Sequence, residues 1–232
     1  MPAARESLLD AAYTALARRP WSAVRMVDVA ASAGVSRQTL YNEFGGKDGL
    51  ARALVRREAD GYLAGVERAL AGAAEARDRL TATAEWTATA ARDNALVRAM
   101  LTGCWTEWLP SPPLTAVPST TAVPAQRRAD GPLPAPRDFV RIVRDRAATA
   151  LAGPGADPAD TAELLRSCEL VVRLALSCVA APPGEGGMEE LVRAVLPRHL
   201  VQGRGGQALH PRVAAPGPNG RSRTAGVRSP RR

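Results

Sequence analysis

Aromatic residues make up only 4% of the 232 residues, and the chain holds just three cysteines and two histidines. The cysteines, Cys104, Cys168 and Cys178, are odd in number and lack CxxC spacing, so we expect neither a disulfide framework nor a zinc finger. His199 and His210 have no serine, cysteine or acidic partner in a recognisable catalytic arrangement. We therefore expect no catalytic residues, no metal site and no cofactor.

Long apolar runs are also lacking. No uninterrupted apolar stretch reaches the roughly 20 residues that a bilayer span needs. The start of the chain alternates charged and apolar residues, whereas a secretory signal would be continuously apolar. The sequence thus predicts a soluble cytoplasmic protein that does not engage a membrane, and in a reducing cytoplasm the cysteines are expected to be inert thiols buried in apolar helices.

What the chain does hold is alanine and arginine. Hydrophobic residues make up 46% of it, 46 residues are alanine, and 30 of the 31 basic residues are arginine. This composition favours closely packed helices over β-branched sheet, so the expected fold class is all-α.

The net charge of +8 is concentrated at one end. Residues 203–232 carry seven arginines and no acid, which leaves 24 basic and 23 acidic residues in 1–202. This tail is rich in glycine and proline and is predicted to be disordered. A cationic chain of this kind can add affinity for DNA without adding specificity; an inert extension is the alternative.

Apolar residues at helical spacing predict three short amino-terminal helices. The first carries its apolar residues between Leu8 and Leu16 and ends before Pro20, which disfavours helix in the residue before it. Gly34 suits the left-handed turn that closes the second helix. Ser36 is a cap residue for the third.

Further helices are predicted from Lys47, over 78–91 and 93–109, from Asp138, and over 158–181 and 188–201. Residues 110–136 hold eight prolines, a composition that predicts a long mobile loop. The chain divides into an amino-terminal domain (1–48), a helical domain (49–202) and the basic tail (203–232).

The stretch from Val27 to Phe44 has the sequence form of a helix-turn-helix, with a Gly-Val-Ser turn between two short helices and the small Ala30 where they approach. With Leu40 and Phe44 committed to the core, the second helix turns polar side chains outward. Such side chains can reach base edges and phosphates within a major groove. They are Arg37, Gln38, Thr39, Tyr41 and Asn42. A plain helical hairpin with a solvated face is the alternative.

The pattern Ala30-x3-Gly34-Val35-Ser36-x2-Thr39-Leu40-Tyr41-x2-Phe44-x2-Lys47-x2-Leu50, preceded by LLDAAYTALA, closely resembles the amino-terminal domain of TetR-family transcriptional regulators. The resemblance covers about residues 5 to 54. It implies a TetR-like, all-α fold of about nine helices. In such a fold a three-helix DNA-binding domain precedes a helical ligand-binding and dimerisation domain.

The resemblance also implies specific DNA contacts. Thr39 and Tyr41 match positions that touch phosphates, and Lys47, the chain's only lysine, matches a lysine that contacts the DNA backbone. The second helix lacks the usual capping Ser or Thr, but the guanidinium of Arg25 suits a phosphate. The predicted DNA-binding set is Arg25, Ser36, Arg37, Gln38, Thr39, Tyr41, Asn42 and Lys47. For Lys47, an ordinary surface charge is the alternative.

Beyond residue 54 the resemblance is one of organisation. The helices 158–181 and 188–201 would form a homodimer, with the small residues Ser167, Ala175 and Ser177 letting two helix pairs pack closely. The alternative is that these helices complete a monomer core.

A cluster of apolar residues with a few polar groups between helices is typical of a small-molecule site. The candidates are Trp86, Asn94, Met100, Leu101, Cys104, Trp105, Trp108, Phe139 and Arg173. Ordinary core residues are an equally good interpretation.

The sequence therefore predicts a homodimeric repressor that binds a palindromic operator in double-stranded DNA and is released by an unknown small-molecule effector. A regulator without a small-molecule inducer is one alternative. A helical redox or lipid-binding protein is another. An enzyme is disfavoured, because the chain has no G-x-S-x-G, and Gly45-Gly46-Lys47-Asp48 lacks the other residues of a phosphate loop.

Overall fold

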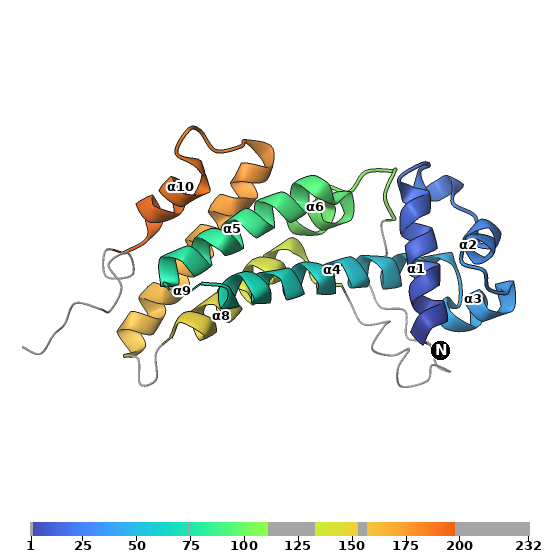
Figure 1. Ribbon diagram of the computed structural model, residues 1–232, viewed down its shortest axis with the longest axis horizontal. Coiled ribbons are helices and arrows are strands. Elements are labelled where there is room, and N and C mark those ends of the chain that lie inside the picture. The colour runs from blue at the N-terminus through green and yellow to red at the C-terminus, as the bar shows by residue number, and fades with distance from the viewer. Residues whose placement is uncertain (1, 74, 111–132, 153–156, 198–232) are drawn as a thin grey trace, which may run out of the picture.

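Every regular element is helical in the described residues (2–73, 75–110, 133–152 and 157–197) of the computed structural model shown in Figure 1, which confirms the all-α prediction. In chain order the helices are α1 (Pro2–Leu16), the 3-10 helix η1 (Trp21–Ala23), α2 (Met26–Ser32), α3 (Arg37–Phe44), α4 (Lys47–Ala71), α5 (Ala76–Asp93), α6 (Ala95–Thr102), α8 (Pro136–Leu151), α9 (Pro158–Ala180) and α10 (Gly187–Val195). None of these described helices combines the length and hydropathy needed to cross a membrane.

The long helix α4 joins two groups of helices. Figure 1 shows α1, α2 and α3 packed at the end where α4 begins, and α5, α6, α8, α9 and α10 gathered along its remaining length. Near its start, Leu50 and Leu54 are fully buried, and further along Tyr62, Val66 and Leu70 are buried in turn. One helix therefore contributes to the core at both ends of the molecule.

The amino-terminal helices follow from local signals in the sequence. Leu8, Leu9 and Leu16 are buried along one side of α1. Gly34, between α2 and α3, has a φ of +66°, a conformation that glycine adopts without the steric cost of a Cβ atom. The Ser36 side chain accepts a hydrogen bond from the Thr39 amide at 3.0 Å and so caps α3.

The bundle core is built around a buried tyrosine. The Tyr62 hydroxyl lies 3.1 Å from that of Thr87 on α5, and its ring meets Phe139 of α8 edge-on at 6.1 Å between centroids. The indole of Trp86 donates to the Tyr62 backbone carbonyl at 3.0 Å. Burial raises the Tyr62 pKa to about 12, so this hydroxyl stays protonated at any physiological pH.

The predicted helix over 93–109 is too long. Helix α6 ends at Thr102, because Gly103 turns left-handed (φ +76°) and its amide bonds back to the Ala99 carbonyl at 2.8 Å. Cys104 is consequently exposed rather than buried in a helix, and that prediction was wrong. The short helix η1, directly after Pro20, was not predicted.

Two small residues that were predicted to make the dimer contact lie inside the chain. Ser167 and Ala175 are 4% and 0% exposed, on the side of α9 that packs against the chain's own helices. Only Ser177 of the three is exposed. Helix α10 also ends earlier than predicted, at Val195, and the proline-rich stretch over 111–132 and the tail lie outside the described residues.

Two glycines of α4 should respond oppositely to substitution by alanine. A Cβ atom on Gly65 would overlap the Trp86 indole, whereas one on Gly61 meets nothing within 4 Å. We expect Gly65→Ala to lower the free energy of unfolding by about 1–3 kcal/mol through overpacking. Gly61→Ala should raise it by about 0.5–1 kcal/mol, because alanine has less backbone entropy to lose.

Chemical denaturation of both variants, with circular dichroism as the signal, measures the difference. Equal effects of the two substitutions would show that Trp86 is not packed against α4 as described.

Candidate nucleic-acid interface

Helix α3 has one buried side and one exposed side. Leu40 and Phe44 are 0% and 8% exposed and anchor the helix in the amino-terminal core. At 100° per residue, four exposed positions form a continuous arc that begins beside Phe44 and ends opposite the buried side. They are Arg37, Gln38, Tyr41 and Asn42. Half of the predicted DNA-binding residues thus share one exposed helix face.

Two amides occupy adjacent turns of this face. The Gln38 side chain donates from Nε2 to Oδ1 of Asn42 at 2.8 Å, which fixes both side chains along the helix. Primary amides carry a donor and an acceptor side by side and can match the N6 and N7 atoms of adenine. This arc can therefore make base contacts as well as backbone contacts.

Ser36 and Thr39 lie beside the arc rather than on it. Their hydroxyl oxygens are 2.8 Å apart, and the Ser36 oxygen also accepts from the Thr39 amide. Thr39 is half-buried, while Ser36 is exposed. Both hydroxyls serve first to begin α3 at a defined residue.

Lys47 sits at the first position of α4 and is engaged within the chain. Its Nζ donates to the backbone carbonyl of Ser22 at 3.0 Å and lies 5.6 Å from the centre of the Trp21 ring. An ammonium has three donors, so this bond leaves capacity for a phosphate. The sequence offered no sign of the Trp21 and Ser22 contacts, because these residues lie 25 or more positions away.

Arg25, the residue before α2, is also paired. Its guanidinium donates to both carboxylate oxygens of Asp28, at 3.0 and 2.9 Å, and Arg19 reaches the same carboxylate at 3.3 Å. The hydrogen bonds from Arg25 hold the Asp28 pKa below its usual range, and the same pairing raises the Arg25 pKa. Arg25 remains largely exposed, so a phosphate could share it only by competing with Asp28.

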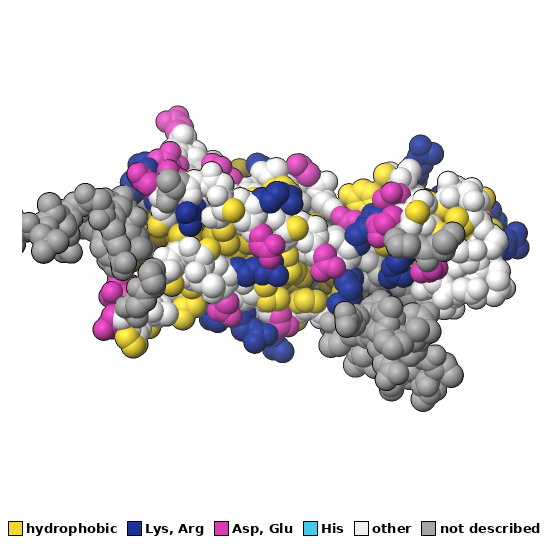
Figure 2. Space-filling model, turned by 60° about the horizontal axis from the view of Figure 1, so that its bottom comes forward, with side chains coloured by type: hydrophobic (Ala, Val, Ile, Leu, Met, Phe, Trp, Pro, Cys, Tyr) yellow, Lys and Arg dark blue, Asp and Glu magenta, His cyan; other side chains and the backbone are white. Residues whose placement is uncertain are grey.

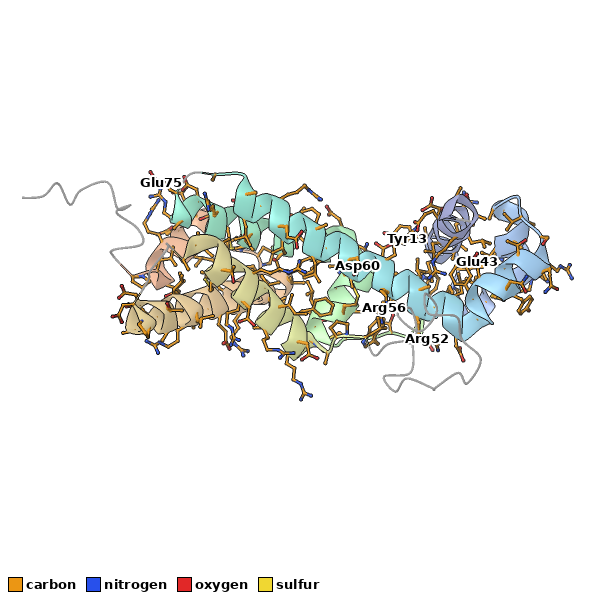
Figure 3. The ribbon with its side chains drawn as sticks, turned by 90° about the horizontal axis from the view of Figure 1, so that it is seen from below. Tyr13, Glu43, Arg52, Arg56, Asp60 and Glu75 are labelled. Atoms are coloured by element: carbon orange, nitrogen blue, oxygen red, sulfur yellow. The ribbon has the colours of Figure 1, made fainter. Side chains whose placement is uncertain are left out.

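The interface carries little net charge. Residues 25–48 contain three basic and three acidic side chains. Glu43 lies beside α1 in Figure 3 and pairs with Arg5 at 3.6 Å. On the face drawn in Figure 2, the helix-turn-helix end shows isolated basic side chains among uncharged atoms rather than a continuous basic patch.

The nine predicted ligand-binding residues do not form one cluster. Met100, Leu101 and Phe139 are buried in the bundle, and Trp86 lies partly buried beside them against α4. Arg173, in contrast, is exposed on α9 and pairs with Glu169 at 2.7 Å. That pairing lowers the pKa of the Glu169 carboxyl.

The others belong to the ends of α6. Asn94 caps α6 by accepting from the amides of Leu96 and Val97, and it donates to Glu58 of α4 at 2.7 Å. Cys104, Trp105 and Trp108 follow α6, where Cys104 and Trp108 are exposed and Trp105 is half-buried. These four residues are therefore placed at junctions between helices.

A mostly apolar groove of about 570 Å³ lies elsewhere, between the end of α4, the start of α5 and the end of α8. It is lined by Glu67, Leu70, Ala71, Arg79, Asp145, Arg146, Thr149 and Ala150, none of which was predicted. Helical periodicity could not predict this groove, because it forms between segments far apart in the sequence. Arg146, for example, donates to the Leu63 carbonyl, 83 residues away.

Solved structures that match the chain include the TetR family repressor AlkX from Dietzia sp. strain DQ12-45-1b, implicated in biodegradation of n-alkanes, with 20% identity and a TM-score of 0.42 over 85% of this chain and 95% of that one. A putative TetR-family transcriptional regulator from Rhodococcus sp. matches with 22% identity and a TM-score of 0.44, over 84% of this chain and 96% of that one.

The sequence of the amino-terminal domain gives the sharper comparison. Residues 8–54 match the family described as bacterial regulatory proteins, tetR family. A 66-residue stretch, 28% of the chain, is 48% identical to the HTH-type transcriptional regulator AlkX of Mycobacterium tuberculosis, and the match spans 31% of that relative's length. Residues 8–54 therefore form an amino-terminal domain of the tetR family of bacterial regulatory proteins.

Proposed function

We propose that this chain is a cytoplasmic, homodimeric repressor of transcription that binds a palindromic operator and is released by a small molecule. The observation that carries the proposal is the exposed arc of α3, backed by the buried Leu40 and Phe44. A rigid helix with long polar side chains on one exposed face is the element that helix-turn-helix proteins insert into the major groove. The work of the site is binding rather than catalysis.

Within this arc we assign two kinds of contact. The amides of Gln38 and Asn42 read base edges, and Arg37 and Tyr41 contact the DNA backbone. Lys47 and Arg25 would touch flanking phosphates from the starts of α4 and α2, while Ser36 and Thr39 hold the start of α3. Because few of these groups are charged, affinity should depend less steeply on salt than in strongly basic DNA-binding domains.

A second chain would supply the second half-site. The outer side of α9 carries Leu170, which is 52% exposed, flanked one turn away on either side by the exposed Arg166 and Arg173. Arginine is enriched at protein interfaces, so this side of α9 could pack on a partner with Leu170 at its centre. A two-fold axis beside α9 and α10 would make each recognition helix available to one half-site.

For the effector we propose the bundle core around Trp86, Met100, Leu101 and Phe139. These side chains are apolar, and the neighbouring Tyr62 and Thr87 hydroxyls offer a polar group for orientation. A ligand there must separate α5 from α8 or α4. The ligand can release DNA only if it binds this altered helix arrangement more tightly than the DNA-binding arrangement. A regulator that responds to no small molecule is the remaining candidate within the same class.

Tyr41→Phe and Gln38→Ala should separate backbone contacts from base contacts. The first removes one hydroxyl and should weaken operator and random DNA alike, by about tenfold for a bond to a charged phosphate. The second should cost about 1–3 kcal/mol at one base pair and relax the preference there. Gel-shift titrations on an operator selected from random duplexes measure both.

Tyr13→Phe is the matched control, since Figure 3 shows Tyr13 between α1 and α4 rather than on α3. Burial, followed by the charge of Glu58, raises the Tyr13 pKa, so the Tyr13 hydroxyl stays neutral in the DNA-binding assay. If Tyr13→Phe and Tyr41→Phe change DNA affinity equally, α3 is not the reading helix.

Leu170→Arg should dissociate the dimer without unfolding the protomer. Leu170 is already half exposed, so its replacement costs the single chain little, whereas two facing arginines would place unpaired charges in an apolar contact. Leu176 and Val179 are half-buried against the chain's own core and are poorer choices. Sedimentation velocity should show a monomer with the helical content of the parent.

Ala71→Arg adds the same charge at the exposed last residue of α4 and should leave the dimer intact. A dimeric Leu170→Arg protein would place the two-fold contact away from this side of α9.

The redox alternative makes its own prediction about the thiols. Cys104 is exposed, whereas Cys168 and Cys178 are buried, and burial raises the Cys168 pKa to about 12. The Cys168 thiol therefore stays protonated at pH 8. A disulfide reagent should therefore modify one thiol rapidly in the folded protein and all three in denaturant. Cys104→Ser should abolish the rapid phase; rapid modification of a second thiol would favour a redox role.

A further inference from the structure

Residues 103–110, which we term the strap, connect helix α6 of the bundle to the amino-terminal helices. The strap begins at Gly103, where α6 ends, and a turn closes within it through the bond from the Leu109 amide to the Thr106 carbonyl at 3.0 Å. In Figure 1 the connection that leaves α6 crosses to the end of α1 farthest from the amino terminus. The strap therefore bypasses α4 and gives α6 a second route to the amino-terminal domain.

Trp108 attaches the strap to the corner between α1 and η1 by two hydrogen bonds. Its indole Nε1 donates to the carbonyl of Leu16, the last residue of α1, at 3.1 Å, and its own carbonyl accepts from the Trp21 amide at 2.9 Å. Carbonyls in the last turn of a helix have no partner within the helix. Trp108 thus supplies, from 92 residues away, a partner that α1 cannot provide for itself.

Residues of this corner contact Lys47, which begins α4 just after α3. Trp21 is 9% exposed, and its ring faces the Lys47 ammonium, which also bonds to the Ser22 carbonyl. Lys47 begins α4 immediately after the turn that ends α3. The strap, η1 and the start of α4 therefore form a continuous set of contacts around the base of the helix-turn-helix.

Trp108 itself is 48% exposed, an unusual state for a tryptophan whose donor and carbonyl are both paired. Its ring contributes comparatively little burial for its size, while its polar atoms make defined bonds. This favours a role in setting geometry over a role in the core.

We propose that Trp108 is a positioning residue, through which the strap transmits the position of α6 to the helix-turn-helix and sets where α3 lies in the DNA-binding form. The inference rests on the proposed function and concerns the regulation of the same site. A dimer must place its recognition helices about 34 Å apart to enter successive major grooves. When the strap holds the junction between α1 and η1, α3 already has the position that DNA binding requires. Without the strap contact, this junction must become ordered when DNA binds, which lowers the affinity for the operator.

The test compares Trp108→Phe with Trp105→Phe in the full chain. Both replace a tryptophan of the strap by phenylalanine, but only the first removes the indole donor to Leu16. The probe is an operator selected by the parent protein from random duplex DNA, together with the same duplex carrying one added central base pair and a random duplex.

We expect Trp108→Phe to bind the operator three- to tenfold more weakly, in keeping with one lost hydrogen bond. Binding to random DNA should stay within twofold, and discrimination against the added base pair should fall. Trp105→Phe should match the parent on all three duplexes. A Trp108→Phe protein that matches the parent, or one that loses random and operator binding equally, overturns the proposal.

A measurement without DNA separates this inference from the proposed function. Hydrogen exchange over residues 17–24 should be faster in Trp108→Phe than in Trp105→Phe, because the corner has lost a bond; unchanged exchange overturns the positioning role. If exchange is faster but the parent selects no operator, the strap contact stands and the proposed DNA-binding function fails.

Discussion

The continuity of α4 is the constraint on which the rest of the structure depends. Its 25 residues begin directly after the turn that ends α3 and span about 37 Å, from the amino-terminal helices into the bundle. Leu50 and Leu54 are buried against the amino-terminal helices, and Tyr62 and Val66 are buried in the bundle, so neither group of helices has a core without it. Because a helix bends far less easily than a loop, the two groups cannot reorient independently.

Polar groups specify how the two groups of helices meet beside α4. Glu58 accepts from Arg57 and from Asn94, the cap of α6, while Arg57 also reaches Asp10 on α1 at 2.7 Å. The Arg57 and Glu58 side chains are only 24% and 16% exposed. Pairs of this kind contribute modestly to stability, but a partly buried charge without its partner is costly. The network therefore fixes one arrangement of α1, α4 and α6 more than it strengthens the fold.

The DNA-reading face has a different chemical character. In the proposed contacts only the amides of Gln38 and Asn42 would carry sequence information, and residues 25–48 have equal numbers of basic and acidic side chains. Electrostatic attraction supplies most non-specific affinity for DNA, so a neutral reader binds random DNA weakly and gains more of its affinity from matched base pairs. Correct placement of α3 then matters more than in a strongly basic domain, which gives the contacts of Trp21, Lys47 and Trp108 their significance.

Local signals in the sequence predicted most of the helices and the exposed side of α3. The spacing of Leu40 and Phe44, the Ser36 cap and the glycines after α2 and α3 act within a few residues, and they determine which side chains of α3 face outward. The same reasoning failed after Thr102, because apolar residues at helical spacing continue past Gly103 although the left-handed glycine ends the helix. The rule that glycine closes helices would have found that boundary.

The sequence by itself determined most of the helices, the buried and exposed sides of α3 and the match of residues 8–54 to the tetR family. Only the tertiary structure decided the partners of Lys47, the packing of Trp86 against Gly65, and the attachment of Trp108 to Leu16. Helix periodicity depends on neighbours three or four residues apart, whereas these contacts join residues up to 92 positions apart. Their geometry exists only once α4 and the bundle have brought distant segments together.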